Sequence, residues 1–551
     1  MLLVGVNAKF IHSNLAIRYL SKMDARCSFC EFTVQDRPEQ IAARLYKTGE
    51  QVFLFSCYIW NIRHILKICN ILKQADDHIQ IGLGGPEVSF NAKEYLEENP
   101  AVDFILCGEG EPAIGLFADS LNSLDFDGVP GLWYRKDGVI HQSSVQPKEA
   151  DLESLPFPYT KEDVQNLKNR ILYFETSRGC PYRCAFCLSG GAGSLRFMSL
   201  AKVQNAIDFF AEHKVPLVKL VDRTFNADPK RALAIIEAIK AKNGGTTYHF
   251  EIRAETMTEA LIKSLQNAPK GMFQLEIGVQ SVHPETLKRI NRKPDFEKLC
   301  KVVRQLAENQ NMHLHLDLIA GLPGETLEQF ISSFNQLMAL KPHNLQLGFL
   351  KKLKGSTLEA PGSAFWNFAP YEVIHSDAMT YGELLMLHDV EEMLERYYNS
   401  GSFYETMSYL LPAYYGGREF DFFKELAEFA AGDTIPKSQK AMYEMLFEFT
   451  KKQFNDEHII NRIIFDYCLS HRDALSFMQA DEGLKSKAFE FLKKPERVTH
   501  YFEYYTGVKP VVLYKKIRFV PIGGRVIAFD YEHGLAVDVT AEIEQEETAN
   551  V

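Results

Sequence analysis

Three cysteines lie close together in this chain, at Cys180, Cys184 and Cys187, with the spacing C-x3-C-x2-C. Cysteine thiolates hold iron–sulfur clusters, and a four-iron cubane normally takes four such ligands. Three ligands in one short loop leave one iron with an open position, which is the feature that separates a working metal site from a structural one. The spacing therefore predicts a [4Fe-4S] cluster that can accept one further ligand.

Zinc is the alternative metal. A structural zinc site would need a fourth protein ligand, and the later candidates, His213, His249 and Cys300, are far from the loop in sequence. Nothing at a typical zinc spacing completes the set. The cysteine pattern thus favours an iron–sulfur cluster.

The cysteine loop, with Phe186 just before the third cysteine and Arg178 and Gly179 before the first, resembles the signature of radical S-adenosylmethionine (SAM) enzymes. In that family the open iron is chelated by the amino and carboxylate groups of SAM. The resemblance implies reductive cleavage of SAM to a 5′-deoxyadenosyl radical, which abstracts hydrogen from a substrate carbon. It also implies an electron donor such as flavodoxin or ferredoxin.

The composition excludes other classes of protein. The 551 residues predict about three domains, and 46% hydrophobic with 24% charged residues is typical of a soluble globular protein. A net charge of -11 argues against a nonspecific nucleic-acid surface, so no DNA partner is expected. The ten cysteines show no disulfide framework, which predicts a cytoplasmic location. The longest apolar stretch, Val52 to Trp60, is too short for a membrane span, and no signal peptide is expected.

The first domain, residues 1–125, alternates apolar runs with amphipathic segments. Buried strands alternating with helices imply a parallel sheet with helices on both faces, a Rossmann-like, doubly wound fold. The expected strands are Leu2–Val6, Phe29–Val34, Val52–Phe55, Ile79–Leu83 and Phe104–Leu106. The expected helices lie near Leu15–Ser21, Ile41–Lys47, Ile62–Lys73 and Ala92–Glu97.

Residues 126–168 form a proline-containing linker, with a small hairpin expected around Leu132–His141. A second alternating series fills residues 169–360. Its expected strands are Ile171–Thr176, Leu217–Val221, Tyr248–Ile252, Phe273–Val279, His313–Ile319 and Leu345–Leu350. The expected helices between them are Ala201–Lys214, Arg231–Lys242, Met257–Leu265, Phe296–Asn309 and Leu327–Leu340. Six strands fall short of a closed eight-stranded barrel and predict an open, partial (β/α)6 barrel.

Polar residues follow the barrel strands at the ends where parallel barrels place their active sites. The set resembles the radical SAM branches of coproporphyrinogen oxidase and the methylthiotransferases. That resemblance implies a SAM pocket lined by Phe186, Glu251, Arg253, Gln280, Arg292 and Asp317. Carboxylates suit the ammonium and ribose diol of SAM, and a planar guanidinium suits its carboxylate. Strand-end Asp and Glu also commonly cap the next helix, which is the structural alternative for each residue.

Glycine-rich turns follow the strands of the first domain. Turns of this kind let backbone amides approach a phosphate or a nucleotide tail, and all of them would meet at one edge of the sheet. The runs from Gly84 to Glu87 and from Gly108 to Glu111 resemble the cobalamin-binding domain of class B radical SAM enzymes. The resemblance implies cobalamin contacts from Asn14, Ser56, Tyr58, Trp60, Asn61, Gly84, Gly85, Pro86, Glu87, Gly108, Glu109, Gly110 and Glu111.

One part of the cobalamin signature is missing. The Asp-x-His-x-x-Gly motif, whose histidine ligates cobalt from below, is absent, and His12 is followed by Ser13 and Asn14. Cobalamin would therefore bind with its own base displaced and no histidine on cobalt. The alternatives are a purely structural nucleotide-binding-like domain and a second cluster of the methylthiotransferase kind on cysteines from the set Cys27, Cys30, Cys57, Cys69 and Cys107.

Residues 361–551 carry no motif that can be tied to chemistry. Helical patterns dominate, at Tyr381–Tyr398, Ala441–Gln453, His458–Cys468 and Lys485–Lys494, and a small β tail is expected over Val511–Asp538 with a turn at Gly523 and Gly524. Aromatic residues between Phe403 and Phe423 are expected to form core. The segment looks like an accessory domain of one bacterial subgroup.

Together these resemblances identify a cobalamin-dependent radical SAM enzyme. Methylation of an unactivated carbon or of phosphorus is the commonest chemistry of that family, so a small molecule or a peptide is expected as substrate. A radical SAM methylthiotransferase, a radical SAM cyclase or rearrangement enzyme, and a non-catalytic cobalamin or iron–sulfur sensor are the alternatives. The intact cysteine loop and SAM-pocket residues weigh against the sensor, because a sensor needs no SAM pocket.

Overall fold

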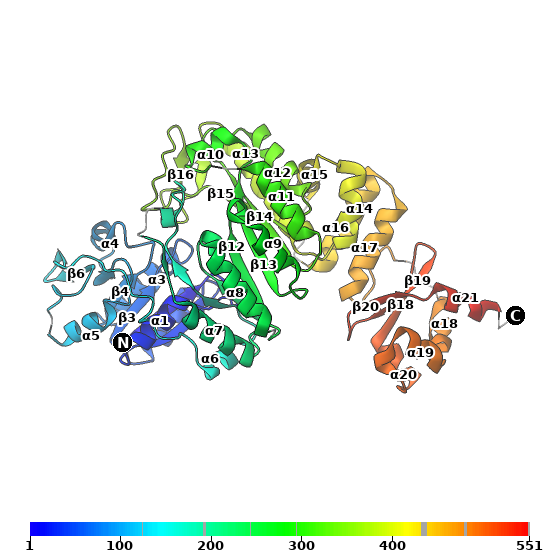
Figure 1. The fold of residues 1–551 in the computed structure, drawn as a ribbon, viewed down its shortest axis with the longest axis horizontal. Coiled ribbons are helices and arrows are strands. Elements are labelled where there is room, and N and C mark those ends of the chain that lie inside the picture. Colours follow the sequence, from blue (N-terminus) through cyan, green and yellow to red (C-terminus); the bar gives the residue numbers. More distant parts are fainter. Residues whose placement is uncertain are drawn as a thin grey trace. The chain divides into compact units, whose positions relative to one another are not determined.

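The computed structural model describes residues 1–123, 125–190, 194–242, 244–293, 295–430, 438–478 and 482–548 (Figure 1). The chain forms two compact units. The first comprises residues 1–333 and 340–384, and the second comprises residues 334–339 and 385–551. None of the described helices combines the length and the apolar character that crossing a membrane requires.

A seven-stranded sheet opens the first unit. Its order is β2-β1-β3-β4-β5-β6-β7, and β1 to β5 are parallel. The strands are β1 Leu2–Asn7, β2 Ser28–Thr33, β3 Val52–Ser56, β4 Gln80–Gly84 and β5 Phe104–Leu106, which confirms all five predicted strands. Because β1 lies between β2 and β3, the chain reverses direction across the sheet there, and such a switch point is where open α/β sheets bind ligands.

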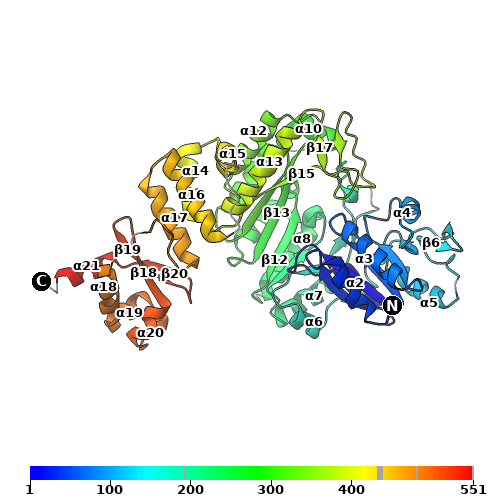
Figure 2. The same ribbon diagram turned by 180° about the vertical axis from the view of Figure 1, so that it is seen from behind.

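Helices cover both faces of this sheet, as predicted for a doubly wound fold. They are α1 Leu15–Met23, α2 Pro38–Tyr46, α3 Ile62–Ala75, α4 Ala92–Glu98 and α5 Ile114–Ser123. Ile17 of α1 and Ile114 of α5 pack on the face that carries Leu3. The side-by-side helices α2 and α3 pack on the opposite face, with Val4 (Figure 2). The alternation of side chains along β1 therefore gives each helical layer its own core.

The predicted hairpin is confirmed as β6 Leu132–Lys136 and β7 Val139–Gln142. It joins the first sheet, because β6 pairs antiparallel with β5. The hairpin thereby covers an edge that would otherwise leave backbone groups of β5 unpaired. The domain boundaries drawn from the sequence stay a prediction.

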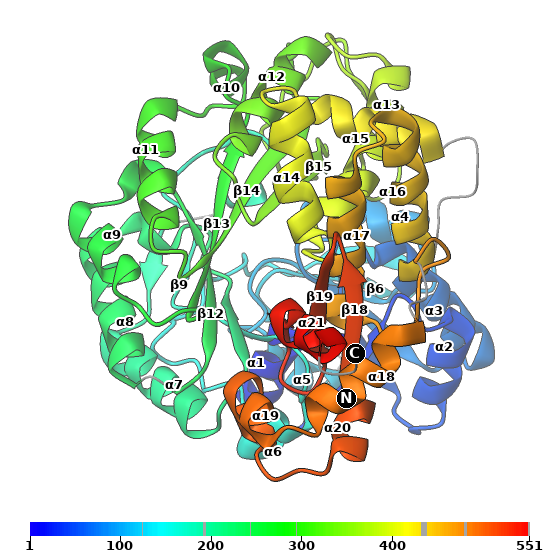
Figure 3. The same ribbon diagram turned by 90° about the vertical axis from the view of Figure 1, so that its right-hand side faces the viewer.

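The second sheet confirms the predicted six-stranded partial barrel. Its strands are β8 Leu172–Phe174, β11 Leu217–Leu220, β12 Thr247–Ile252, β13 Phe273–Gln280, β14 His313–Ala320 and β15 Asn344–Phe349, all parallel, in the order β15-β14-β13-β12-β11-β8. An outer layer of helices surrounds them (Figure 3). These are α7 Leu200–Glu212, α8 Pro229–Lys242, α9 Glu259–Gln266, α11 Phe296–Ala307 and α12 Leu327–Met338.

The interior of this barrel is polar. Residues alternate between buried and half-buried along β13 and β14, so one side-chain row packs under the helices and the other faces inward. The inward row of β14 begins His313, His315 and Asp317. Two short helices, α6 Lys161–Asn166 and α10 Pro284–Arg289, were not predicted.

The second unit is mainly helical, as predicted. Its elements are the C-terminal part of α13 Tyr381–Met393, then α14 Tyr404–Tyr415, α15 Glu419–Ala430, α16 Gln439–Gln453, α17 Glu457–Ser470, α18 Glu482–Leu492, α19 Pro495–Tyr501, α20 Pro510–Lys516, β18 Ile517–Ile522, β19 Arg525–Asp530, β20 Leu535–Asp538 and α21 Thr540–Thr548. The predicted β tail is confirmed from Ile517 onward, with its turn at Gly523 and Gly524. The strand expected over Val511–Lys516 is wrong, because Pro510 occupies the first position of helix α20 there.

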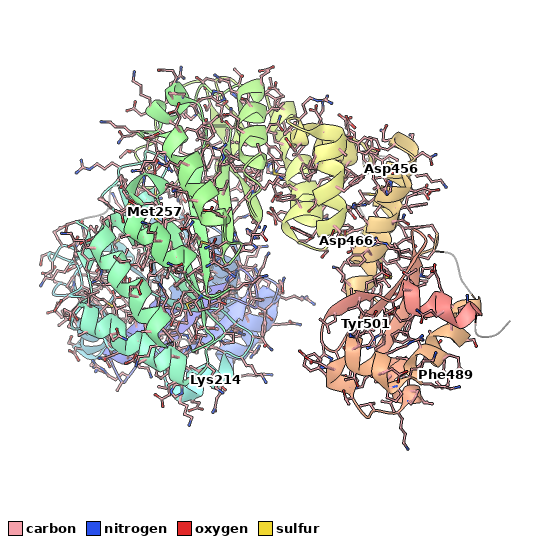
Figure 4. The ribbon with its side chains drawn as sticks, turned by 45° about the vertical axis from the view of Figure 1, so that its right-hand side comes forward. Lys214, Met257, Asp456, Asp466, Phe489 and Tyr501 are labelled. Atoms are coloured by element: carbon pink, nitrogen blue, oxygen red, sulfur yellow. The ribbon has the colours of Figure 1, made fainter. Side chains whose placement is uncertain are left out.

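The aromatic residues of this unit form core, as predicted. Phe403, Phe420 and Phe423 are fully buried, whereas Tyr404 is 67% exposed. Asp466 of α17 (Figure 4) accepts hydrogen bonds from the backbone amide and hydroxyl of Thr406, which ties α17 to the first turn of α14. Burial raises the pKa of Asp466 to about 6 against these hydrogen bonds.

Glu325, in the turn after β14, is a fully buried carboxyl. One of its oxygens accepts a hydrogen bond from the Ser281 hydroxyl, and the other has no partner. Burial raises the pKa of Glu325 to about 8 from its ordinary value of 4.5, in spite of the Ser281 hydrogen bond. The side chain is therefore neutral in the folded protein at neutral pH.

Glu325→Gln should remove a pH dependence of stability. Because the folded pKa is raised, the native state holds the extra proton, and stability falls as pH rises from about 4.5 to about 8, by up to about 1.4 kcal/mol per pH unit. Thermal unfolding should show Glu325→Gln close to the wild type at about pH 5 and more stable than it at about pH 9. The exposed Glu285→Gln of α10 is the control, and a Glu325→Gln curve parallel to the wild type across this range would refute the assignment.

Candidate active site

A cavity of about 710 Å³ lies in the first unit, between the carboxyl ends of the first sheet's strands and the barrel. Its wall from the first sheet contains most of the residues predicted to hold cobalamin, namely Asn14, Ser56, Tyr58, Trp60, Gly84, Gly85, Pro86, Gly108, Glu109, Gly110 and Glu111. The barrel contributes Tyr173, Glu175, Arg178, Lys219, Arg223 and Glu251. The cavity therefore faces both folds at the ends where each places its ligands.

Two glycines of the cavity wall have little room for a side chain. Gly85 has a φ of +106°, and a Cβ atom there would lie 2.7 Å from the Cys57 carbonyl oxygen. A Cβ at Gly110 would lie 3.0 Å from a methyl carbon of Leu20. These positions leave backbone exposed to the cavity, as close approach of a large cofactor requires. The wall continues inward as an apolar slot of Leu3, Ile17, Leu54 and Ile114, which suits an extended organic tail. The residues present fit cobalamin.

Two predicted contacts are not brought to this wall. Asn61 is fully buried, and its amide donates to the carbonyl oxygens of Val6 and Ser56. Glu87 is 2% exposed and accepts hydrogen bonds from the hydroxyls of Tyr95 and Tyr371. Both side chains use their polar atoms within the protein, so their positions argue against the predicted cofactor contacts.

His12 is the one histidine in the described wall of the cavity. Its Nδ1 is 2.6 Å from the hydroxyl oxygen of Tyr173 on the barrel strand β8. Burial lowers the pKa of His12, with Lys9 and Lys219 acting in the same direction, so the ring is neutral at neutral pH. That no histidine ligates cobalt stays a prediction, and His12 makes a contact between the two folds.

The loop with Cys180, Cys184 and Cys187 is anchored by backbone contacts. The Ala185 amide donates to the Ile290 carbonyl at 2.9 Å, and the Asn291 side chain donates to the Arg183 carbonyl at 2.6 Å. All three thiols are free and half-buried, so none is consumed by a disulfide or sealed in the core. Such thiols fit a cluster that must remain open to a further ligand.

Asp222 holds the base of this loop. It is 1% exposed, and its carboxylate accepts from the backbone amide and hydroxyl of Thr176 at 3.0 and 3.1 Å and from the Ser177 hydroxyl. Burial raises the pKa of Asp222 to about 6, while these hydrogen bonds favour the charged form. Asp222 lies just after strand β11, and no local sequence pattern indicates this anchoring role.

Arg178, in the short strand β9 Ser177–Arg178, joins the loop to the first sheet. Its guanidinium contacts Glu175 at 2.7 Å, Glu111 at 2.6 Å and Glu109 at 2.9 Å. Arg196 makes a further ion pair with Glu109. The two glutamates predicted to touch cobalamin thus line the cavity while they are ion-paired to the barrel.

The predicted SAM residues gather around the cysteine loop and the upper barrel. The Arg253 guanidinium lies 3.8 Å from the ring centre of Tyr182 in the loop. Arg292 donates to the Gly278 carbonyl oxygen at 2.7 Å. Gln280 has a φ of +73° at an irregularity in the β13–β14 pairing, and its amide lies against Gly278. Phe186 is half-buried in the same loop.

Charge around Cys184 is balanced by these arginines. Burial raises the pKa of the Cys184 thiol, and the positive charges of Arg292 and Arg253 oppose that rise. Asp317 presents a buried carboxylate oxygen that has no hydrogen-bond partner in the described structure. An unpaired buried acceptor is costly, so this atom fits a donor supplied by a ligand such as the ammonium or ribose of SAM.

Sequence reasoning missed a polar layer beneath these residues. The Glu276 carboxylate accepts from Lys219 and lies 2.9 Å from His249 Nε2. Burial would raise the pKa of Glu276, but the contacts to His249 and Lys219 outweigh it and lower that pKa to about 2. Burial, with Glu276 and Glu251 adding to it, raises the pKa of Asp317 well above its ordinary value. The sequence does carry a signal for this polar layer. A polar residue stands at every second position of the barrel strands β13 and β14, whereas buried parallel strands are usually apolar along their length.

Arg178→Ala should disrupt the cysteine loop. The change leaves the buried Glu111 and Glu175 and the half-buried Glu109 near one another without their shared cation, and breaking a buried pair typically costs about 3–5 kcal/mol. We expect a lower melting temperature and reduced iron uptake on anaerobic reconstitution. Arg183→Ala, an exposed arginine of the same loop, is the matched control. Equal effects of the two substitutions would contradict the bridging role.

Three protein families match successive parts of the chain. The B12 binding domain matches residues 1–118, the radical SAM superfamily matches residues 174–337, and a protein of unknown function family (DUF4080) matches residues 361–536. The first two matches cover the two folds that face the cavity. The third falls on the region for which the sequence predicted an accessory domain.

Characterised relatives resemble the first part of the chain. The cobalamin-dependent radical SAM methyltransferase TokK of Streptomyces tokunonensis is 29% identical, over 56% of this chain and 48% of TokK. The cytidylyl-2-hydroxyethylphosphonate methyltransferase of Streptomyces wedmorensis is 23% identical, over 51% of this chain and 60% of that protein. The chain spans about half the length of the first of these relatives.

Solved structures share the fold. The cobalamin-dependent SAM radical enzyme OxsB superposes with a TM-score of 0.57 at 16% identity, covering 84% of this chain and 78% of OxsB. The methyltransferase TsrM of Kitasatospora setae gives a TM-score of 0.54 at 16% identity, covering 67% and 78%. The fold, the cysteine loop and the two family matches agree: the chain joins a region that matches the B12 binding domain to one that matches the radical SAM superfamily, and it resembles TokK and OxsB, which are named as cobalamin-dependent radical SAM enzymes.

Proposed function

We propose that this protein is a cobalamin-dependent radical SAM methyltransferase that acts on an unactivated carbon or a phosphorus atom. The observation that carries the proposal is the single cavity between the two folds, because its walls join the glycine turns of the B12-binding domain to the barrel end beside the cysteine loop. A cofactor held on one wall and a substrate held on the other would lie within the same cavity. TokK, named as a cobalamin-dependent radical SAM methyltransferase, supports this assignment.

Different residues of the chain would bind the iron–sulfur cluster and cobalamin. Cys180, Cys184 and Cys187 would hold a [4Fe-4S] cluster, and the cavity wall with Gly84, Gly85, Gly108 and Gly110 would hold cobalamin. When bound, these groups supply one-electron reduction of SAM and a methyl carrier. The protein itself positions the reactants and keeps water from them.

The SAM site is the upper barrel. Arg292 offers a planar guanidinium to the carboxylate of SAM, and Asp317 offers its unpaired buried oxygen to the ammonium or ribose. Glu251 lies in the cavity wall, and burial raises its pKa, with Glu276 acting in the same direction. The carboxyl oxygens of Glu251 can accept hydrogen bonds from ribose hydroxyls.

The one-electron reduction of SAM needs an electron from an external reductant. We propose that a small electron-transfer protein such as flavodoxin or ferredoxin supplies the electron in the cytoplasm. The abundance of reduced cysteines supports that compartment, since all ten are free in the structure. A small molecule or a peptide would be the substrate.

Cys184→Ala should abolish formation of 5′-deoxyadenosine. The protein reconstituted without oxygen should bind about one four-iron cluster per chain and cleave SAM when a strong reductant is added. Cys300→Ala, a half-buried cysteine of α11, is the matched control and should keep full activity. If 5′-deoxyadenosine still forms with Cys184→Ala, or if zinc occupies the site instead of iron, the proposal fails.

Hydroxocobalamin should bind with its own base displaced from cobalt. The absorption spectrum of the complex should be of the base-off form, and Gly85→Val should weaken binding at least tenfold because its side chain would enter the cavity wall against Cys57. Gly138→Val is the control, since a Cβ atom there meets nothing within 4 Å, although its φ of +77° strains it equally. A folded wild-type protein that does not bind cobalamin would restrict the B12-binding domain to a structural role.

A further inference from the structure

A second cavity, of about 490 Å³, lies within the second unit of the chain. It is formed by the end of α17, by α18 and α20, and by β18. Five cationic side chains contribute to its lining, and none of the described residues in that lining is an aspartate or glutamate; the cations are Arg472, Lys485, Lys515, Lys516 and Arg518. In a chain whose net charge is -11, this is a local reversal of charge.

Four of these five cations have no carboxylate partner among the described residues. Lys516 alone forms an ion pair, with Glu532. Four positive charges without carboxylate partners around one concavity create a local positive potential that attracts an anion. Among the described residues, the cavity therefore lacks a group that balances this charge.

The two arginines are fixed in place by neutral groups. Arg518 donates to the carbonyl oxygens of His471 and Asp473 at 3.2 and 2.9 Å. Arg472 donates to the Lys515 carbonyl at 3.0 Å, and its guanidinium lies 4.7 Å from the ring centre of Tyr531. These contacts orient both guanidinium groups without neutralising them. Pre-oriented guanidinium forks match the oxygens of a phosphate group.

The rest of the lining is apolar. Leu484 and Ala488 of α18 face it together with Phe519 and Val520 of β18. Phe489 of α18 (Figure 4) contacts Tyr514 at the rim with a ring separation of 6.0 Å. A volume of 490 Å³ falls in the range of small-molecule sites. The ligand should therefore combine an anionic end with an organic part.

We propose that this cavity, here called the basic pocket, binds a small organic phosphate or diphosphate. A phosphate monoester carries about -1.5 to -2 charges at neutral pH, so one phosphate group offsets up to about half the charge of four cations and two phosphate groups offset most of it, whereas a single carboxylate offsets one charge. The site is separate from the cavity of the first unit and does not depend on the proposed methyltransferase function. It gives the accessory region a ligand of its own.

Inorganic pyrophosphate is the probe for this site. Isothermal titration of the full-length protein with pyrophosphate should show binding that weakens as salt is raised, since exposed charges are screened. Lys485→Gln and Lys515→Gln should each weaken binding about three- to fivefold, and the double variant about tenfold or more. Both side chains are exposed and make no ion pair in the described structure, so the variants should fold normally.

Lys509→Gln is the matched control, because Lys509 is an exposed lysine beside α20 that lies outside the basic pocket. Its affinity for pyrophosphate should equal that of the wild type. Unchanged binding in Lys485→Gln/Lys515→Gln, or equal loss in Lys509→Gln, would show a nonspecific charge effect and overturn the proposal. No detectable binding of pyrophosphate to the folded protein would also overturn it.

Three further ligands separate phosphate from other sources of negative charge. Citrate tests for a general anion site, phosphatidic acid vesicles test for a membrane surface, and a single-stranded oligonucleotide tests for nucleic acid. Pyrophosphate binding that exceeds citrate binding, with neither vesicle nor oligonucleotide binding lost in the double variant, supports the proposal. Citrate binding as tight as pyrophosphate, or vesicle or oligonucleotide binding that depends on Lys485 and Lys515, would overturn it.

Discussion

The bridge made by Arg178 is the interaction on which the candidate site depends. One guanidinium binds Glu175 of the barrel and Glu109 and Glu111 of the first sheet, two residues before the first cysteine of the loop. Several buried carboxylates can lie this close to one another only when a nearby cation balances their negative charges. The loop and the glycine-rich edge of the first sheet are therefore held in one geometry, with the main cavity between them.

The ion pairs of Arg178 also determine which groups of the glycine turns remain available to bind a cofactor. Glu109 and Glu111 form ion pairs with Arg178 and Arg196, and Glu87 accepts hydrogen bonds from two tyrosine hydroxyls. The wall is left with backbone at Gly84, Gly85 and Gly108 and with the apolar slot behind it. Recognition by backbone and shape suits a large cofactor whose many peripheral groups are neutral amides.

The sequence predicts the parts of the structure that depend on residues close to one another along the chain. The strands of the first sheet were found because buried parallel strands are apolar along their length, whereas β13 and β14 of the barrel alternate apolar and polar residues. The bridge of Arg178 to Glu111 spans 67 residues and leaves no local trace, so its partners could not be predicted. Val511 and Val512 favour a strand by propensity, yet this segment is helical. Pro510 starts the helix, and Leu513 is the residue of α20 that is buried.

The barrel interior and the basic pocket show two different uses of buried charge. In the barrel, Lys219 and His249 keep Glu276 ionised, and burial together with that negative charge raises the pKa of Asp317. The carboxylates there are balanced within the chain, and one acceptor oxygen of Asp317 is left for a ligand. In the basic pocket two of the cations, Arg472 and Arg518, are oriented by carbonyl groups, and four of the five cations lack a carboxylate partner among the described residues. A site whose charge is balanced selects a ligand by hydrogen bonds, whereas a site with uncompensated charge first requires a counter-ion, so the two regions must recognise ligands of different chemistry.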